Sequence, residues 1–492
     1  MKIGKKDLPF YFLVLFLFSL SLLLGFYNLG DWLLMDDEGL YLYSAWRVSL
    51  GEITYRDFFV SQTPLSFYFT GFLFKVFSPD VRLARGICYV LFLVIAFFIY
   101  LISKDIFKLN KYFSLLNASV FIFTKNINFL GKTFMPDCFM LFWGTIALYF
   151  VLKAEDKSSS ERRALYLFLF GFFGGLAALS KMFGILLLFG YYLFLLYSFI
   201  SKKGSQNKIH LRVLHPLVGF LLSFGIIYVL MLIFIPSTYY CTLGFHLGRE
   251  KTVLGLSIVL NSLINLLKFI GNHNYGVVPV ALVSIISGFI FKKKEKILLF
   301  FLILPFFFLT FIPVDFLTRY LFFTLIVFSL FFGDSIKLIH SKKRIFSVSF
   351  PVILIIVVLS LAPTFNIKKI LRYDRGTRDL VSYINEHSNP DDYIFSDFTG
   401  INFYSKRSCP PLLVDVSGAM ISSGQITALD IERQCELYKV KIIFVHKSGG
   451  AHHLISLKDY SKFQKYLDKK YTFQGKIKRE FQEYEIYFRK SS

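Results

Sequence analysis

The sequence predicts a polytopic α-helical membrane protein that ends in a small α/β domain. Of its 492 residues 55% are hydrophobic. Uncharged apolar runs recur along the chain, and they have about the 17–25 residues that an α-helix needs to cross a bilayer. The composition then changes near residue 364, where charged and polar residues become frequent. The first two observations predict the membrane part, and the third predicts the terminal domain.

Eleven apolar runs are the candidate transmembrane helices. We expect them at 10–28, 83–103, 112–130, 138–152, 164–180, 182–200, 214–236, 274–291, 297–313, 317–336 and 345–363. The first run is not followed by a small-residue cleavage site, so it predicts a retained helix rather than a removed signal peptide. Together these runs define a transmembrane domain over 1–363.

The distribution of basic residues predicts the orientation of the chain. Its formal net charge is +23, and much of it lies in short clusters between apolar runs, such as "SKKGSQNKIHLR" and "FKKKEK". Such loops remain in the cytoplasm during membrane insertion. We therefore expect a protein of the cell (plasma) membrane with a cytoplasmic N-terminus and an external C-terminal domain. This arrangement explains the charge without nucleic acid as a partner.

Two external connections, 28–82 and 237–273, are longer than a turn. The first contains "EGLYLYSAWRVSL" and "PLSFYFTGFLFKVF", which we interpret as helices that lie along the membrane surface. The second of these segments has about fourteen residues, which is short for a span. If it crossed the membrane, every later basic loop would lie on the external side.

The C-terminal segment 364–492 has the pattern of a small external α/β domain. The stretch "DRGTRDLVSYINEHSNPDDYIFSDFTGINFYSKRS" has the pattern of a helix-like segment, a turn with proline and then a short strand. "VKIIFVHK" is typical of a buried strand, and the last residues alternate. An external location permits a disulfide between Cys409 and Cys435, but their spacing does not decide whether one forms. His452 and His453 are an exposed pair that is more often neither catalytic nor structural than a metal site.

Acidic residues gather where we expect the external ends of the spans. They are Asp36, Asp37, Glu38, Asp57, Asp137 and Asp315. Transporters keep ionisable groups near the bilayer midplane, whereas the middles of these runs have almost none. The pattern therefore indicates chemistry at a membrane face rather than a conduit.

The acidic triplet 36–38 has several physical interpretations. One carboxylate can act as a general base on a hydroxyl group, and a neighbouring like charge raises its pKa toward neutrality. Paired carboxylates can instead hold a divalent cation beside a phosphate. The plainer interpretation is that the triplet caps the following helix. These interpretations are compatible, since a capping run can also present one carboxylate.

Basic residues occur at the same predicted face. Arg85 begins the second run, Lys181 separates the fifth and sixth, and Arg319 with Tyr320 begins the tenth. Arg249 and Lys251 lie in "FHLGREK", beside His246. Singly, each cation is most simply an anchor to lipid headgroups. As a group they could bind the phosphate of a lipid.

Several of these motifs together resemble those of a known group of enzymes. "MDDEGLYLYSAWRVSLGEITYRDFFVSQTPLSFYFTGFLFKVF", followed by "VRLARG", resembles the opening of GT-C membrane glycosyltransferases. It is most similar to the branch of protein O-mannosyltransferases and of aminoarabinose transferases of lipid A. "MPDCFML", "GFFGGLAALSKMFGILLL" and "TRYLFF" resemble later motifs in the same order, over most of residues 1–335. "QTPL" departs from this group, because some members have a lysine there.

The resemblance implies an inverting glycosyltransferase. Such enzymes move a sugar from a polyprenyl-phosphate carrier to a hydroxyl of a lipid, glycan or protein acceptor at the external face. Asp37 would be the catalytic base and Glu38 its support, and Asp137 would position the acceptor. The resemblance gives contacts with the carrier phosphate or the sugar to Arg85, Lys181 and Arg319. From their place at the predicted external face, we also expect substrate-binding roles for Asp36, Asp57, His246, Arg249, Lys251 and Tyr320. No cofactor is certain, and a divalent cation held by Asp37 and Asp137 is one option.

Two other functions share some of these features. A flippase for lipid-linked sugars would have the same apolar spans and basic loops, but it should need polar groups within the spans. A glycan ligase or oligosaccharyltransferase would have the same external carboxylates and would transfer a whole glycan. Incubation with a panel of polyprenyl-phosphate sugars separates the transferase from the flippase, because a flippase releases no lipid phosphate.

Overall fold

The structure is a computed structural model of the chain. It describes residues 8–27, 29–30, 36–124, 130–156, 160–201, 209–247, 264, 285–286, 288–290, 293–308, 322–342, 375–448, 453–479 and 482–491. The chain divides into two compact units. The first, the helical unit, comprises Met1–Leu29, Arg85–Val229 and Thr252–Asn366. The second, the mixed unit, comprises Gly30–Ala84, Leu230–Lys251 and Ile367–Ser492.

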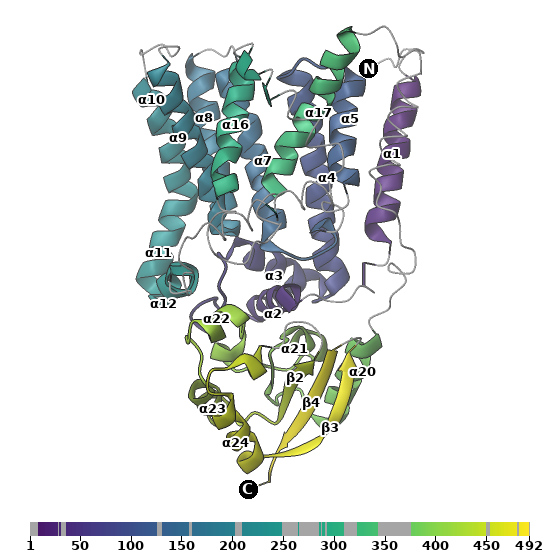
Figure 1. The fold of residues 1–492 in the computed structure, drawn as a ribbon, viewed down its shortest axis with the longest axis vertical. Coiled ribbons are helices and arrows are strands. Elements are labelled where there is room, and N and C mark those ends of the chain that lie inside the picture. Colours follow the sequence, from purple (N-terminus) through teal and green to yellow (C-terminus); the bar gives the residue numbers. More distant parts are fainter. Residues whose placement is uncertain are drawn as a thin grey trace. The chain divides into compact units, whose positions relative to one another are not determined.

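The helical unit is a bundle of long helices (Figure 1). Its helices are α1 (Leu8–Phe26), α4 (Val81–Asp105), α5 (Lys111–Phe123), α7 (Pro136–Glu155), α8 (Ser160–Ser180), η2 (Met182–Gly184), α9 (Ile185–Ile200), α10 (Ile209–Phe220), the π-helical turn η3 (Leu221–Gly225), α11 (Ile226–Phe234), α16 (Lys294–Phe308) and α17 (Phe322–Lys342). By the same division, the first residues of α4, up to Ala84, and the last of α11, from Leu230, belong to the mixed unit.

Six helical stretches are long and apolar enough to cross a membrane. They are Leu8–Phe26, Val81–Asp105, Pro136–Glu155, Glu161–Ser180, Met182–Ile200 and His210–Phe234. Each coincides with a predicted span, so these six predictions are confirmed and the chain is an integral membrane protein. The α5 and α16 helices have 13 and 15 residues. Most of the run 274–291 and all of 345–363 lie outside the described residues, so a total of eleven spans remains a prediction.

The outer surfaces of these helices expose large apolar side chains. Phe12 is 72% exposed, Ile200 is 70% exposed and Phe234 is 76% exposed. In water, an apolar surface of this extent would be very unfavourable, whereas the hydrocarbon core of a bilayer solvates it. The exposed side chains therefore agree with a lipid-facing bundle.

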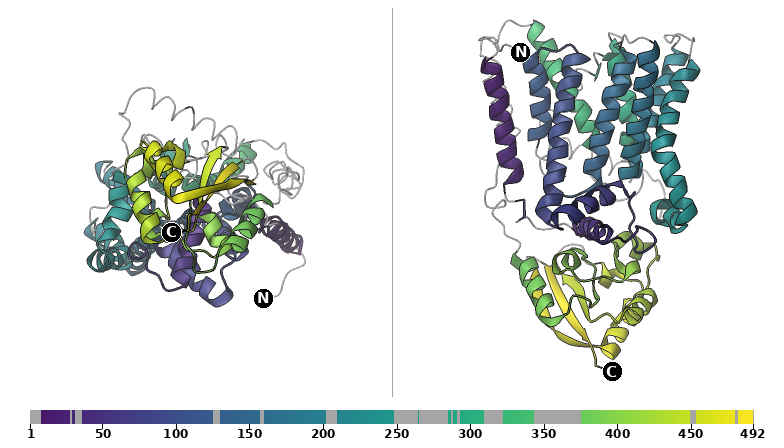
Figure 2. Two further views of the ribbon diagram at one scale, coloured as in Figure 1. Left: turned by 90° about the horizontal axis from the view of Figure 1, so that it is seen from below. Right: turned by 180° about the vertical axis from the view of Figure 1, so that it is seen from behind.

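Glycines allow the α8 and α10 helices to pack closely. A Cβ atom added to Gly171 would lie 1.9 Å from the carbonyl oxygen of Pro216, and one added to Gly175 would lie 2.0 Å from Ser223 Oγ. The two glycines are four residues apart and so lie on one face of α8. Small residues at this spacing are a common means of helix association in membranes. The α8 and α10 helices lie side by side among the blue and teal helices in the right-hand view of Figure 2.

The mixed unit joins the first long connection to the C-terminal segment. It contains α2 (Asp36–Ser49), α3 (Leu65–Phe77), α12 (Ser237–Tyr239), the π-helical turn η4 (Tyr240–Gly244), α13 (Phe245–Leu247), α20 (Arg375–His387), β1 (Ile394–Ser396), α21 (Gly400–Ser405), η7 (Pro411–Leu413), α22 (Gly418–Ser422), α23 (Ala428–Leu437), β2 (Ile442–Ser448), η8 (Leu454–Ser456), α24 (Tyr460–Lys470), β3 (Tyr471–Arg479) and β4 (Gln482–Arg489). The two helices expected in the first connection are α2 and α3. Their position at a membrane surface remains a prediction.

Four strands form a mixed sheet in the order β1-β2-β4-β3. The β1 and β2 strands are parallel, and β4 is antiparallel to both β2 and β3. The side chains from Ile442 to His446 of β2 are all buried, so both faces of the central strand are covered. Figure 1 shows α20 beside β3 and β4. This sheet confirms the α/β character of the tail, while its external location remains a prediction. Cys409 and Cys435 are buried free thiols, so no disulfide joins them.

Candidate functional site

The acidic triplet lies at the N-terminus of α2 in the mixed unit. Glu38 is completely buried, and Asp37 is half-buried. The helix begins at Asp36, whose side chain lies outside the described residues. Acids in the first helical turn are stabilised by the helix dipole and by the free backbone N–H groups there. The capping and catalytic interpretations therefore remain compatible, with Asp37 as the more accessible described carboxylate.

Asp57 has partners that belong to its own turn. Its carboxylate accepts hydrogen bonds from the side chain of Arg56 (2.8 Å) and from the backbone N–H of Ile53 (2.8 Å). The guanidinium of Arg56 lowers the pKa of Asp57. These contacts close the loop between α2 and α3. Asp57 therefore has a local structural role, and its substrate-binding role remains a prediction.

His246 belongs to a polar cluster inside the mixed unit. Its Nε2 atom lies 2.9 Å from the carbonyl oxygen of Ser61. The hydroxyl of Ser61 donates a hydrogen bond of 2.9 Å to Asp415 Oδ2. Asp415 is 5% exposed, and it comes from the C-terminal segment. The cluster thus joins three distant parts of the chain.

In the helical unit, Asp137 and Lys181 form a buried ion pair. Lys181 Nζ donates to Asp137 Oδ1 at 2.7 Å, and the two side chains are 5% and 2% exposed, respectively. Pro136 occupies the first turn of α7, where its missing N–H has no cost, and this places Asp137 at the favourable end of the helix dipole. Lys181 is extended between α8 and η2. Asp137 Oδ2 is buried and has no hydrogen-bond partner among the described residues.

Two further buried cations lie at the end of the bundle where α4 and α7 begin. Arg85 is fully buried, and its Nη1 donates to the carbonyl oxygen of Leu29 at 2.6 Å. Lys132 is 6% exposed, and burial lowers its pKa to about 8. Lys132 was not among the predicted residues. Its place in "GKTFMPD", five residues before Asp137, is the sequence signal for it, but one lysine in a short external link also has the pattern of an ordinary solvated loop.

A second buried carboxylate, Glu155, lies at the other end of α7. It forms ion pairs with Arg212 of α10 and with Lys294 at the start of α16. The hydroxyl of Tyr191 of α9 donates to Glu155 Oε1 at 3.2 Å. Glu155 thus joins three other helices. It was not singled out from the sequence, because "KAEDKSSSERR" resembles an ordinary charged loop.

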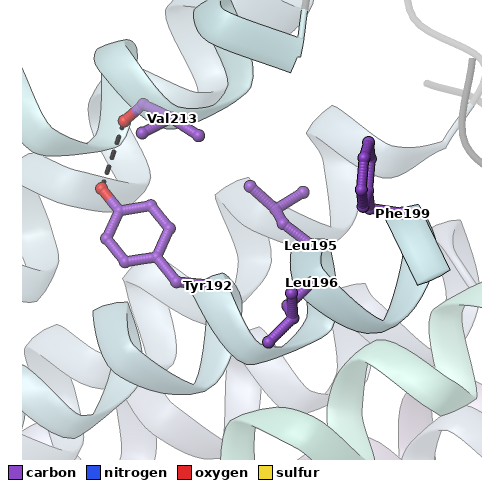
Figure 3. A pocket seen from close by; sticks show the side chains of 5 residues that line it. All are labelled: Tyr192, Leu195, Leu196, Phe199 and Val213. Atoms are coloured by element: carbon purple, nitrogen blue, oxygen red, sulfur yellow. Dashed lines mark hydrogen bonds between the residues drawn. The ribbon is translucent and has the colours of Figure 1, made fainter. Parts of the chain in front are cut away.

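A shallow apolar groove runs between α9 and α10 (Figure 3). It has a volume of about 330 Å³ and is lined by Tyr192, Leu195, Leu196, Phe199 and Val213. The hydroxyl of Tyr192 donates to the carbonyl oxygen of Val213 at 3.1 Å, so the one polar side chain of the lining is occupied. This lining suits a hydrocarbon chain and does not suit a phosphate or a sugar.

A metal site does not follow from the described residues. Among them, no group of three or more His, Cys, Asp or Glu side chains could hold a metal ion. Asp137 Oδ1 already contacts the ammonium group of Lys181. This positive charge would repel a divalent cation bound at the same oxygen. We therefore derive no step through a metal. The predicted contacts Arg249, Lys251, Arg319 and Tyr320, and also Asp315, lie outside the described residues.

Comparison with known proteins finds one matching family model and several similar folds. Residues 61–224 match the family model of dolichyl-phosphate-mannose-protein mannosyltransferases. The fold is similar to that of ArnT from Cupriavidus metallidurans in the apo state, with a TM-score of 0.67 and 13% identity over 96% of this chain and 97% of that one. ArnT bound to undecaprenyl phosphate gives a TM-score of 0.65 and 12% identity, with the same coverage.

The fold is also similar to that of an oligosaccharyltransferase from Archaeoglobus fulgidus in complex with Zn and sulfate. There the TM-score is 0.58 and the identity 14%, over 88% of this chain and 67% of that one. No curated protein sequence matches the chain significantly. The resemblance to GT-C glycosyltransferases is therefore confirmed, and the chain has their fold.

Proposed function

We propose that the chain is an inverting glycosyltransferase that uses a polyprenyl-phosphate sugar as donor. The observation that supports this most strongly is the likeness to ArnT over nearly the whole of both chains, together with the mannosyltransferase family match. A structure of ArnT holds undecaprenyl phosphate, the lipid that would remain after transfer. This likeness supports the donor class, and we propose a hydroxyl of a lipid, glycan or protein as the acceptor.

The chemistry needs one base and one leaving group. The acceptor oxygen attacks the anomeric carbon of the sugar while the bond to the phosphate oxygen breaks, and the lipid phosphate leaves with the bonding electron pair. A carboxylate accepts the proton of the acceptor hydroxyl. In-line attack inverts the anomeric centre. The phosphate is already a good leaving group, so the reaction needs no nucleotide and suits the external face of the membrane.

Asp37 is our candidate for the base. It stands in the first turn of a helix and remains half-exposed, whereas its neighbour Glu38 is completely buried. A general base must reach a bound hydroxyl, which favours the accessible carboxylate. Glu38 then supports the turn. Asp36 keeps its predicted substrate-binding role on sequence alone, as Arg249, Lys251, Arg319 and Tyr320 do.

Asp137 is our candidate for positioning a hydroxyl group in the helical unit. Its Oδ1 is occupied by Lys181, and its Oδ2 is buried and lacks a hydrogen-bond partner among the described residues. A buried carboxylate oxygen left unpaired is costly unless a ligand satisfies it. Arg85, Lys181 and the newly found Lys132 are buried cations in the same unit, and we assign them to the carrier phosphate.

Purified protein in lipid nanodiscs, incubated with a panel of polyprenyl-phosphate sugars and acceptors, tests the proposal. We expect release of polyprenyl phosphate from at least one single-sugar donor. The likeness to an oligosaccharyltransferase makes transfer of a whole glycan the second candidate, so the panel includes one lipid-linked oligosaccharide. In sealed proteoliposomes, movement of intact donor across the bilayer without release of lipid phosphate would instead identify a flippase.

A further inference from the structure

The α2 helix, which carries the candidate base, packs against the C-terminal segment inside the mixed unit. Three residues at four-residue spacing, Gly39, Tyr43 and Arg47, make this contact. Residues four apart lie on one face of an α-helix, so the three form a single stripe. The stripe begins immediately after Asp37 and Glu38.

The first contact of the stripe is between backbones. A Cβ atom added to Gly39 would lie 2.7 Å from Gly400 Cα, 2.8 Å from the backbone nitrogen of Gly400 and 3.1 Å from the ring of Phe398. Two of these three neighbours are main-chain atoms at the start of α21, which cannot turn aside as a side chain can. The first turn of α2 therefore has very little freedom to move relative to α21.

The next two contacts are polar. The phenol oxygen of Tyr43, which is 1% exposed, accepts a hydrogen bond of 2.8 Å from the backbone N–H of Cys409. Arg47 Nη1 donates to Ser408 Oγ at 2.9 Å, and Arg47 also pairs with Glu52. Both hydrogen bonds fix the rotation of α2 about its axis, because each ends on the C-terminal segment.

The α3 helix supports another side of α2. A Cβ atom added to Gly71 of α3 would lie 2.9 Å from the carbonyl oxygen of Ala45, and the rings of Tyr41 and Phe67 are 5.8 Å apart. The α2 helix is thus held between α3 and the C-terminal segment. Its orientation, and with it the direction of its first-turn carboxylates, depends on both.

We propose that Gly39 and Tyr43 are positioning residues, through which the C-terminal domain holds the carboxylates of α2 in the orientation needed for sugar transfer. This inference rests on the proposed function. It gives the domain a defined part in the reaction, since a displacement of about 1 Å in a reacting group can reduce a rate about 100-fold.

The test compares Gly39→Ala with Gly174→Ala in the full chain in nanodiscs. Gly174 lies in a helix with nothing within 4 Å of an added Cβ atom, so it controls for the substitution itself. We expect Gly39→Ala to lower kcat about 100-fold, with KM for the donor and the affinity for undecaprenyl phosphate changed less than about twofold. Gly174→Ala should match the wild-type protein. A merely structural role for Gly39 would not separate kcat from donor binding in this way.

Tyr43→Phe provides a second test if Gly39→Ala does not fold. It removes the acceptor of the Cys409 N–H and keeps the ring, and we expect a fall of about fivefold in kcat at unchanged donor KM. If the wild-type protein transfers sugar and the folded variants have the same kcat, the positioning role of Gly39 and Tyr43 is wrong, while the proposed function stands. If the wild-type protein releases no lipid phosphate from any donor, the proposed function fails, and the inference with it.

Discussion

The two ends of the α7 helix carry buried carboxylates with different surroundings. At the first end, Asp137 pairs with one cation, Lys181, and keeps one oxygen without a hydrogen-bond partner among the described residues. At the other end, Glu155 Oε1 contacts Arg212 and Tyr191. Glu155 Oε2 also lacks a hydrogen-bond partner among the described residues, but it forms an ion pair with the ammonium group of Lys294. The helix dipole also favours a carboxylate at the first end and opposes one at the last. We infer that the carboxylate of Glu155 holds helices together, whereas Asp137 Oδ2 can accept a hydrogen bond from a ligand.

Among changes at the two ends of α7, removal of both partners at the first end should have the largest effect on activity. The double variant Asp137→Asn, Lys181→Met replaces a buried ion pair with neutral groups, which is often close to neutral for stability. We expect a melting temperature within a few degrees of wild type and a loss of transfer of about 100-fold or more. Transfer and thermal unfolding are both measured on the purified protein. Retained transfer would show that Asp137 and Lys181 are structural like Glu155.

Glu155→Gln should have the opposite profile. It leaves two cations without their carboxylate, and loss of one partner from a buried pair costs about 3–5 kcal/mol. We expect a much lower melting temperature but a near-normal kcat per folded molecule. The active fraction is counted by binding of undecaprenyl phosphate. A folded Glu155→Gln protein that does not transfer sugar would remove the distinction between the two ends.

The buried lysine near the first end should give a smaller, pH-dependent effect. Burial lowers the pKa of Lys132 to about 8, so in the free protein it loses its charge as the pH rises through about 8. If it binds the carrier phosphate, kcat/KM for the donor should be level below this pH and fall above it. Lys132→Arg should move this fall to higher pH, and Lys132→Met should lower kcat/KM about tenfold below pH 8 and remove the fall above it. An unchanged pH profile in Lys132→Met would exclude the role.

Much of the fold could be predicted because its elements follow from local patterns. Length and hydrophobicity alone identify the α1 and α4 helices, and residues 442–446 read as a buried strand. The contacts that matter most for the site are not local. The Gly39–Gly400 approach and the Ser61–Asp415 hydrogen bond join residues more than 350 positions apart, which no periodicity encodes.

The sequence predicts which residues belong to the candidate site, but it does not predict which of them contact one another. Asp137 and Lys181 were both singled out from their positions at span ends, but nothing in the sequence pairs them across 44 residues. Lys132 and Glu155 were missed because a charged residue in a short loop has the same pattern whether it is buried or solvated. Burial of a charge depends on the tertiary packing of several helices.

The most direct test of the central claim is transfer by Asp37→Asn. The substitution keeps the shape of the side chain and removes its ability to accept a proton. The measurement is release of polyprenyl phosphate, with undecaprenyl phosphate affinity as the check on folding. We predict turnover below about one-thousandth of wild type at unchanged affinity. Full turnover in the folded variant would contradict the assignment of the α2 carboxylate as the base of a sugar transfer.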